Sequence, residues 1–223
     1  MEVAANLAVI QDKIGQACTK SGRRPDEINV IGVTKYATIE RTEEAVEAGV
    51  KNLGENRNEG FLEKYQNIGD KVTWHFIGTL QSRKVKDIID KIDMLHSLDR
   101  VSLAKEINKR ASSSVNCFIQ VNVSGEASKH GLRAEEVIPF IEEIERYEKV
   151  HVVGLMTMAP HIEDKEEIRK VFQNLTSLRD RIKAKQIHHA PCEFLSMGMS
   201  NDYEIAIEEG ATHIRIGSQL VGD

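Results

Sequence analysis

The sequence predicts an α/β protein folded as a single (β/α)8 barrel of the TIM type, with residues 1–223 forming one domain. Eight short apolar segments that read as strands alternate with segments of helical periodicity. No Pro/Gly/Ser-rich linker and no low-complexity tract divides the chain. A doubly wound open sheet is the alternative. No G-x-G-x-x-G follows the first strand, however, so a dinucleotide site is unsupported.

The chain is expected to begin with an amphipathic helix that ends near Gly22. Its apolar stripe consists of Val3, Leu7, Ile10 and Ile14. The first strand follows at residues 28–35, where INVIGVTK is almost continuously apolar, as is typical of a strand buried on both faces of a parallel sheet. Alternation places Val33 and Lys35 on one face of this strand. An amine is therefore predicted at the carboxyl end of a buried strand, although a solvated lysine is the simpler alternative.

The remaining elements follow the same alternation of strand and helix. Further strands are predicted at residues 50–55, 72–78, 93–98, 115–123, 150–158, 193–198 and 212–217. Helices are predicted at residues 38–49, 57–66, 82–91, 100–112, 137–147, 168–182 and 202–209. The chain stops almost at once after the eighth strand, so we expect the N-terminal helix to cover the place of a normal last helix.

Composition narrows the class of protein. The net charge of −5 argues against a nucleic-acid partner and against a basic membrane-binding surface. No apolar run reaches the roughly 18–20 residues that span a bilayer, and the N-terminus does not resemble a secretion signal. Three widely spaced cysteines form no CxxC pair, which suits a cytoplasmic protein without a disulfide framework or a metal site.

Two late motifs are typical of a phosphate site. In SMGMSNDYEIAIEEG (196–210) the seventh strand ends in a loop of small residues, where Ser200 or Asn201 is placed to cap the next helix. In RIGSQLVG (215–222), Gly217 and Ser218 directly follow the eighth strand. Barrel phosphate sites are often built from the loops after strands seven and eight. Plain helix capping is the alternative for either motif alone.

The eighth strand adds a cation. Alternation puts His213 and Arg215 on one face and two isoleucines on the other, so Arg215 is predicted to point into the barrel. A lysine amine, a phosphate cradle and an inward arginine together suggest pyridoxal 5′-phosphate. The lysine would hold this cofactor as a Schiff base, and the arginine would meet the pyridine nitrogen. A structural ion pair is the alternative for Arg215.

Seven motifs in this order give the chain a close resemblance to the pyridoxal phosphate homeostasis (YggS/PROSC) family. The resemblance covers residues 5–218 and rests on VTKY (33–36), GENR (54–57), HFIGTLQSRK (75–84), VNVSGEASKHGL (121–132), GLMTMAP (154–160), SMGMSND (196–202) and IRIGS (214–218). It implies a barrel of the alanine racemase N-terminal type that lacks the racemase's C-terminal β domain. It also implies a role in cofactor homeostasis, as storage or carrier, with effects on amino-acid metabolism.

Carried over by motif, Lys35 would hold the cofactor, and Arg215 would face its ring nitrogen. Its phosphate would be bound by Ser200, Gly217 and Ser218. Asn56 and His75 are expected to line the pocket; a turn residue and a core histidine are their respective alternatives. The chain departs from the usual family pattern at Arg83, at His130 and in its ending QLVGD, where Val221 and Asp223 replace the expected residues.

Two functions of different classes follow from this site, a non-catalytic binder or carrier and a pyridoxal-phosphate-dependent amino-acid racemase. Racemisation needs an acid/base group on each face of the substrate. In the racemases that the barrel resembles, a tyrosine from the second domain supplies one of them, and none of the four tyrosines here follows the barrel. We therefore expect a cytoplasmic, monomeric binder, with apo-forms of pyridoxal-phosphate-dependent enzymes as its protein partners.

Overall fold

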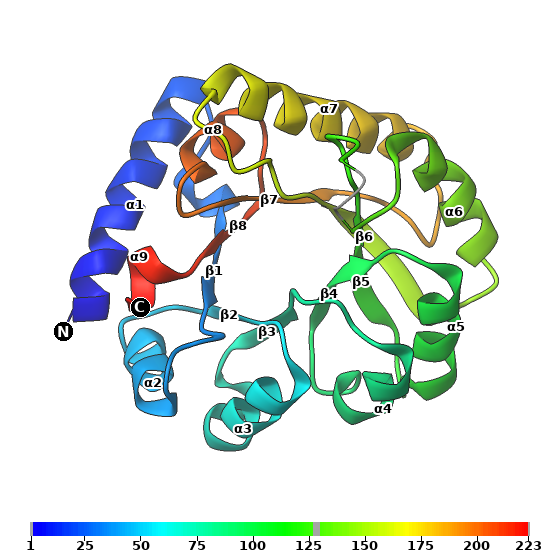
Figure 1. The fold of residues 1–223 in the computed structure, drawn as a ribbon, viewed down its shortest axis with the longest axis horizontal. Helices are drawn as coiled ribbons and strands as arrows, with labels where there is room; N and C mark the ends of the chain where they lie inside the picture. The colour runs from blue at the N-terminus through cyan, green and yellow to red at the C-terminus, as the bar shows by residue number, and fades with distance from the viewer. Residues whose placement is uncertain (1, 127–129, 223) are drawn as a thin grey trace.

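A computed structural model describes residues 2–126 and 130–222 of the chain. In this part of the chain, eight parallel strands pair in sequence order and close into a barrel, because β1 pairs with both β2 and β8 (Figure 1). The strands are β1 (Asn29–Val33), β2 (Asn52–Glu55), β3 (Thr73–Phe76), β4 (Met94–Leu98), β5 (Val115–Gln120), β6 (Val150–Met156), β7 (Phe194–Met199) and β8 (His213–Ile216). The predicted (β/α)8 barrel is confirmed, and the open sheet is excluded.

Helices surround the barrel on its outside (Figure 1). They are α1 (Glu2–Ser21), α2 (Ile39–Glu47), α3 (Asn58–Ile68), α4 (Val85–Ile88), α5 (Val101–Arg110), α6 (Val137–Ile144), α7 (Lys165–Lys183), α8 (Tyr203–Glu208) and α9 (Ser218–Val221). The helix predicted at residues 82–91 is shorter than expected. It begins as a 3₁₀ turn at Ser82–Lys84, a tighter geometry that is common at helix N-termini, and only one α-helical turn follows.

Several strands, among them β1 and β5, end earlier than the sequence predicts. The predicted strand at residues 28–35 ends at Val33, and the one at residues 115–123 ends at Gln120. Beyond Gln120, Val121 keeps only a single bridge, to Leu132. The residues that follow these strand ends form the loops at the carboxyl ends of the strands. Binding and active sites of such barrels lie in these loops.

The N-terminal helix closes the side of the barrel next to the last strand, as expected. In Figure 1, α1 lies along α8 and the short α9. The helix α9 follows β8 directly, where a barrel normally has its eighth helix. Asn6 of α1 donates a hydrogen bond to the carbonyl of Leu220 at 3.0 Å, and Leu220 and Val221 are both buried. The ending QLVGD therefore forms a packed helical turn as far as it is described; Asp223 lies outside the described residues, as do residues 127–129 within VNVSGEASKHGL.

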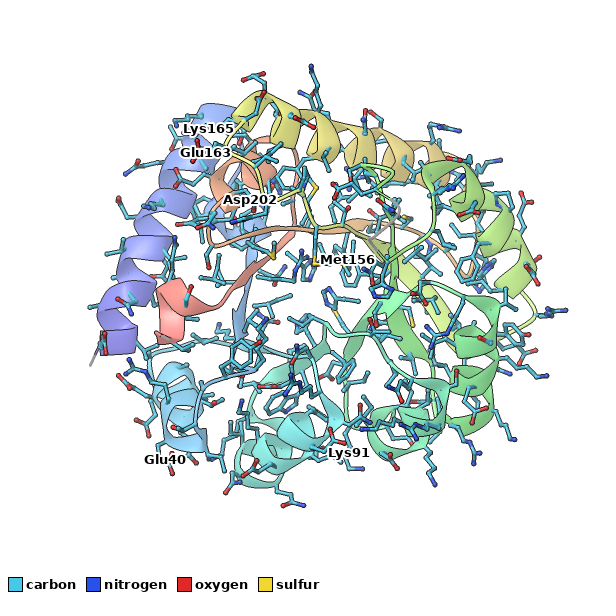
Figure 2. The ribbon with its side chains drawn as sticks, viewed as in Figure 1. Glu40, Lys91, Met156, Glu163, Lys165 and Asp202 are labelled. Atoms are coloured by element: carbon cyan, nitrogen blue, oxygen red, sulfur yellow. The ribbon has the colours of Figure 1, made fainter. Side chains whose placement is uncertain are left out.

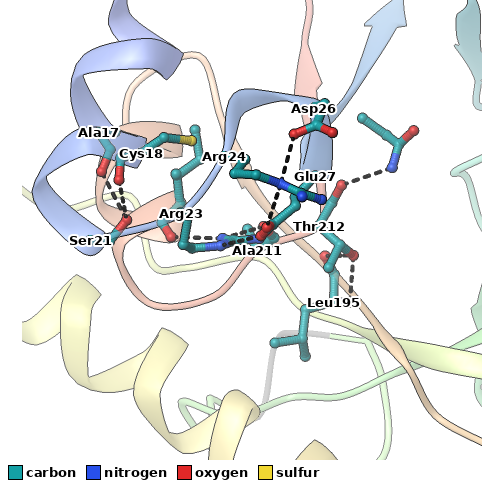
Figure 3. Close-up of polar contacts among 12 residues, drawn as sticks. Ala17, Cys18, Ser21, Arg23, Arg24, Asp26, Glu27, Leu195, Ala211 and Thr212 are labelled. Atoms are coloured by element: carbon teal, nitrogen blue, oxygen red, sulfur yellow. Dashed lines mark hydrogen bonds and ion pairs between the residues drawn. The ribbon is translucent and has the colours of Figure 1, made fainter.

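Polar contacts tie the other end of α1 to the barrel (Figure 3). The Arg23 guanidinium donates to the carbonyls of Ile207 and Ala211 at 2.9 and 2.7 Å. The Thr212 hydroxyl accepts a hydrogen bond from the Leu195 amide at 2.9 Å, which ties the segment before β8 to β7. These contacts hold the amino-terminal end of the barrel and leave its carboxyl end free for a site.

Apolar side chains fill the space between strands and helices, whereas the barrel interior is partly polar. Buried interior side chains include His75, His96, Ser196, His213 and Arg215. Met156 lies near the barrel centre (Figure 2). The three cysteines are free and buried, so no disulfide joins them. None of the helices within residues 2–126 and 130–222 is long and apolar enough to span a membrane.

Candidate functional site

A cavity of about 850 Å³ opens at the carboxyl ends of the strands. Loops after seven of the strands contribute to it. Six of the seven site residues predicted from the sequence line this cavity, namely Lys35, Asn56, Ser200, Arg215, Gly217 and Ser218. The structure thus brings together residues that lie up to 183 positions apart in the chain, as the numbers of Lys35 and Ser218 show (218 − 35 = 183).

Lys35 enters this cavity from a turn that directly follows β1. The Ala37 amide donates to the Thr34 carbonyl at 2.8 Å, which closes the turn with Lys35 and Tyr36 at its centre. Thr38 then caps α2 by accepting a hydrogen bond from the Arg41 amide. The Lys35 side chain is exposed, and its Nζ lies 4.9 Å from the centroid of the Tyr36 ring. Within the described residues, this amine makes no hydrogen bond or ion pair, so it is available to a ligand.

The loop after β7 presents unpaired backbone donors. Gly198 has a φ of +93°, and a Cβ atom there would lie 2.6 Å from the Ala206 Cβ, so glycine is required. The Asp202 carboxylate accepts a hydrogen bond from the Met199 amide at 2.6 Å, which folds the loop back on itself. In the described part of the chain, the amides of Ser200 and Asn201 have no backbone acceptor.

The capping prediction for this loop is wrong. Asp202, rather than Ser200 or Asn201, occupies the N-cap position of α8, and its carboxylate turns back to Met199 instead of capping the helix. Because Ser200 is not used by the helix, it faces the cavity.

The loop after β8 faces the same cavity. Gly217 and Ser218 follow the strand at once, and their amides likewise have no backbone acceptor among the described residues. Unpaired N–H groups that converge on one cavity stabilise an anion. The two small-residue turns that the sequence paired as a phosphate site therefore lie together in the structure.

Arg215 points into the barrel and lines the cavity, as alternation along β8 predicts. Its guanidinium donates to the Ser196 hydroxyl at 2.6 Å and to the Thr157 carbonyl at 2.9 Å. Burial lowers the pKa of Arg215 to about 10, and the nearby Asp202 carboxylate opposes this shift. With this pKa the guanidinium remains charged at neutral pH and can only donate hydrogen bonds.

A chain of hydrogen bonds continues from Arg215 across the barrel interior. Ser196 Oγ lies 2.9 Å from His96 Nδ1, and His96 Nε2 lies 2.9 Å from His75 Nδ1. His75 Nε2 lies 3.1 Å from the amide oxygen of Asn52, which only accepts. The direction of each hydrogen bond in the series is therefore fixed. Arg215 donates to Ser196, Ser196 to His96, His96 to His75, and His75 to Asn52.

This series of hydrogen bonds requires neutral histidines, and the surroundings of His75 and His96 keep both of them neutral. Burial lowers the pKa of His75 to about 3 and that of His96 well below its usual value, with neighbouring histidines adding to both shifts. His213 packs beside them, and burial lowers its pKa to about 4. The chain thus fixes the orientation of Arg215 without adding charge to the interior.

His75 itself does not line the cavity, which corrects the expectation from the sequence. It is fully buried and lies one inward position before Ile77, which does line the cavity. The reason is the depth of the site, since inward-facing side chains of a barrel form layers and His75 belongs to a deeper one. Its alternative interpretation as a core histidine matches its position.

Several cavity residues were not predicted as site residues from the sequence. Asp202 is 8% exposed, and burial raises the pKa of its carboxyl. From the motif SMGMSND alone, Asp202 is predicted only to begin a helix. Gln120 lines the cavity from the end of β5, and His130 lines it from the loop that follows β5. Nothing in the sequence around His130 indicates that it lines the cavity. The loop is brought back to the strand by tertiary contacts, such as the hydrogen bond from the Leu132 amide to the Gln120 carbonyl at 2.9 Å.

The barrel and its cavity define a protein of the alanine racemase N-terminal class. The family model described as "Alanine racemase, N-terminal domain" matches residues 5–223. A pyridoxal phosphate homeostasis protein of Aquifex aeolicus is 40% identical and covers 100% of this chain and 99% of the relative. Another of the same name, from Escherichia coli strain K12, is 32% identical, with coverages of 99% and 96%. The chain belongs to the pyridoxal phosphate homeostasis protein family.

A solved structure gives the same architecture with a ligand. PipY of Synechococcus elongatus, determined with PLP bound, has a TM-score of 0.85 and 27% sequence identity, and the match covers 99% of this chain and 100% of PipY.

Proposed function

We propose that this protein binds pyridoxal 5′-phosphate through Lys35 and serves in the homeostasis of that cofactor. The observation that carries the proposal is that three groups share one cavity: a lysine amine with no hydrogen bond or ion pair to the described residues, backbone amides from two loops without a backbone acceptor among those residues, and a buried arginine. These groups fit the aldehyde, the phosphate and the ring nitrogen of the cofactor, respectively. The names of the relatives and the PLP complex of PipY support the same function.

Each residue has a defined part in the proposed site. The Lys35 amine condenses with the cofactor aldehyde, so that one C=N bond forms as a Schiff base and one water molecule leaves. Ser200, Gly217 and Ser218 bind the phosphate, and Arg215 donates toward the ring nitrogen. Asn56 lines the cavity wall. His75 contributes through the hydrogen-bond chain that orients Arg215, without contacting the ligand.

We further propose that the protein holds the cofactor and does not turn over amino acids; a racemase is the alternative. The cofactor stabilises carbanions when its ring nitrogen is protonated. Arg215 cannot accept a proton, and its charge disfavours a second one nearby. In the described part of the chain, Tyr36 is the only tyrosine that lines the cavity. It adjoins Lys35 in sequence, which does not provide two opposed acid/base groups.

The wider proposal concerns domain, location and partners. Residues 1–223 act as one pyridoxal-phosphate-binding domain, monomeric and cytoplasmic, and apo-forms of pyridoxal-phosphate-dependent enzymes receive the cofactor. Three buried free cysteines support a reducing compartment.

Reductive trapping tests the role of Lys35. After incubation with pyridoxal 5′-phosphate and borohydride, peptide mapping should find one pyridoxyl group, on Lys35. Lys35→Ala should stay folded and lose both this adduct and the visible absorption band, whereas Lys51→Ala, a matched exposed lysine outside the cavity, should keep them. An adduct on a different lysine would refute the assignment. Chiral chromatography with alanine, serine or glutamate should show no turnover, and sustained racemisation would favour the racemase instead.

A further inference from the structure

A buried ion pair lies behind the turn that carries Lys35 and does not itself line the cavity. Lys64 of α3 donates to Glu55 at the end of β2, with 2.6 Å between Nζ and Oε1. Both side chains are almost fully buried, with exposures of 6% for Lys64 and 1% for Glu55. Charged side chains are rarely this buried, so the location of the pair calls for a physical reason.

Both members of the pair bind Thr34, the residue before Lys35. The Thr34 hydroxyl donates to Glu55 Oε1 at 2.7 Å, and the Lys64 ammonium donates to the Thr34 carbonyl. That carbonyl also accepts the Ala37 amide, which closes the turn around Lys35. The Thr34 amide donates to Gly54 of β2 at 3.2 Å. Thr34 is thus fixed through its amide, hydroxyl and carbonyl, while the Lys35 side chain is held by none of these bonds.

General stability does not account for such a pair. Replacing a buried ion pair with apolar side chains of similar volume is often neutral or stabilising, because the lost attraction is offset by the desolvation that is avoided. What the pair adds is a fixed direction for the groups it binds. Here those groups define the backbone from which Lys35 enters the cavity.

We propose that Glu55 and Lys64 are positioning residues that hold the Lys35 turn in the conformation that reaches the cofactor aldehyde. This inference rests on the proposed function. A reacting amine must be held close to the aldehyde carbon for the C=N bond to form, and small displacements reduce such reactivity strongly. The ion pair supplies that placement from outside the cavity.

Two ligands separate positioning from folding. Pyridoxal 5′-phosphate carries the aldehyde, whereas pyridoxine 5′-phosphate carries an alcohol in its place and forms no C=N bond. The double variant Glu55→Gln/Lys64→Met removes both charges together, so no buried charge is left unpaired, and it retains an oxygen for Thr34. We expect it to bind pyridoxal 5′-phosphate about tenfold more weakly and pyridoxine 5′-phosphate within about twofold of wild type. The visible absorption band should fall in parallel with the first loss.

The controls distinguish the possible failures. Phe61→Leu truncates another buried side chain of α3, which packs on Trp74 and has no hydrogen-bonding group for the turn. This variant should leave the ratio of the two affinities unchanged. If the double variant is too unstable to measure, Thr34→Val removes only the hydroxyl bond to Glu55 and should shift the ratio in the same direction. Equal weakening of both ligands, or an unchanged ratio, would overturn the positioning role. If Lys35→Ala leaves the wild-type preference for the aldehyde intact, the proposed function fails instead.

Discussion

The Ser200 hydroxyl lines the cavity without taking part in the hydrogen bonds that hold the surrounding loop. Its side chain lines the cavity, and its hydroxyl forms no hydrogen bond with the described residues. The adjoining loop is held by other atoms, chiefly the bond from the Met199 amide to Asp202. Removing the hydroxyl should therefore leave the protein intact and affect only a ligand that carries an anion.

Ser200→Ala tests this separation. We expect binding of pyridoxal 5′-phosphate to weaken by about 0.5–1.5 kcal/mol if the lost hydrogen bond counts as a neutral one, and by more for a bond to the charged phosphate, while binding of unphosphorylated pyridoxal stays nearly unchanged. Titration with the two ligands measures the difference. Ser102→Ala, on the exposed face of α5, is the matched control and should affect neither ligand. Equal losses for both ligands would show that Ser200 acts through the fold.

At the scale of elements, the short helix α9 depends on its neighbours. It has only four residues, too few to be stable alone, and it begins with Ser218 of the proposed phosphate site. Arg41 of α2 donates to the Val221 carbonyl at 2.7 Å and also pairs with Glu2 and Glu44. This arginine therefore links α1, α2 and the end of α9.

Arg41→Met should loosen α9 while leaving the barrel closed. The variant keeps an unbranched chain but loses the donor to Val221, so the amides of Leu220, Val221 and Gly222 should exchange with heavy water faster than in wild type. Amide exchange followed by mass spectrometry measures this. Arg110→Met removes an arginine paired with Glu106 on the distant α5 and should leave α9 protected. Unchanged exchange in Arg41→Met would mean that apolar packing alone holds α9.

The elements also show how far the sequence determines the fold and the site. Alternation along β8 correctly predicted that Arg215 faces the interior, because the period of two is a local property. The depth of His75 was not predictable, because the layer of a barrel residue depends on the stagger between neighbouring strands. The turn of Asp202 back to Met199 was also missed, since a side-chain bond within a loop leaves no periodic signal.

Long-range partners were the least predictable feature of the site. Lys64 reads as one more lysine on an amphipathic helix, and Glu55 as part of the GENR motif. Only the packing of α3 against the turn after β1 brings both to Thr34. Local patterns thus predicted which strand ends form the site, and tertiary contacts decided which buried groups support it.

At the scale of the whole molecule, the buried histidines make the barrel sensitive to acid. Burial keeps His75, His96 and His213 neutral in the folded protein, with pKa values lowered to about 3 for His75 and about 4 for His213. In the unfolded chain each takes up a proton near its usual pKa of 6.5. The unfolded state thus binds more protons below this pH, so stability is intact above pH 6.5 and falls as the pH drops toward the lowered values.

The size of the effect is large for a protein of ordinary stability. His75 and His213 each cost roughly 2 kcal/mol by pH 5, since the linkage approaches about 1.4 kcal/mol per pH unit below 6.5. Their total of roughly 4 kcal/mol is a large part of the free energy of unfolding of many proteins, and the lowered pKa of His96 acts in the same direction. Asp202 opposes this trend, because its raised pKa lets the folded state take up a proton earlier than the unfolded chain does.

His75→Gln isolates one of the three titrations. Glutamine offers one amide donor toward Asn52 and one oxygen toward His96, so it preserves the direction of the hydrogen-bond chain without titrating. In urea unfolding, the free energy of unfolding should fall between pH 7 and 5 by roughly 2 kcal/mol less in the variant than in wild type, and contributions such as that of Asp202 cancel in this difference. His188→Gln makes the same substitution at an exposed position and should leave the slope unchanged. Parallel pH profiles for His75→Gln and wild type would mean that His75 titrates alike in the folded and unfolded states, and that the interior chain does not hold it neutral.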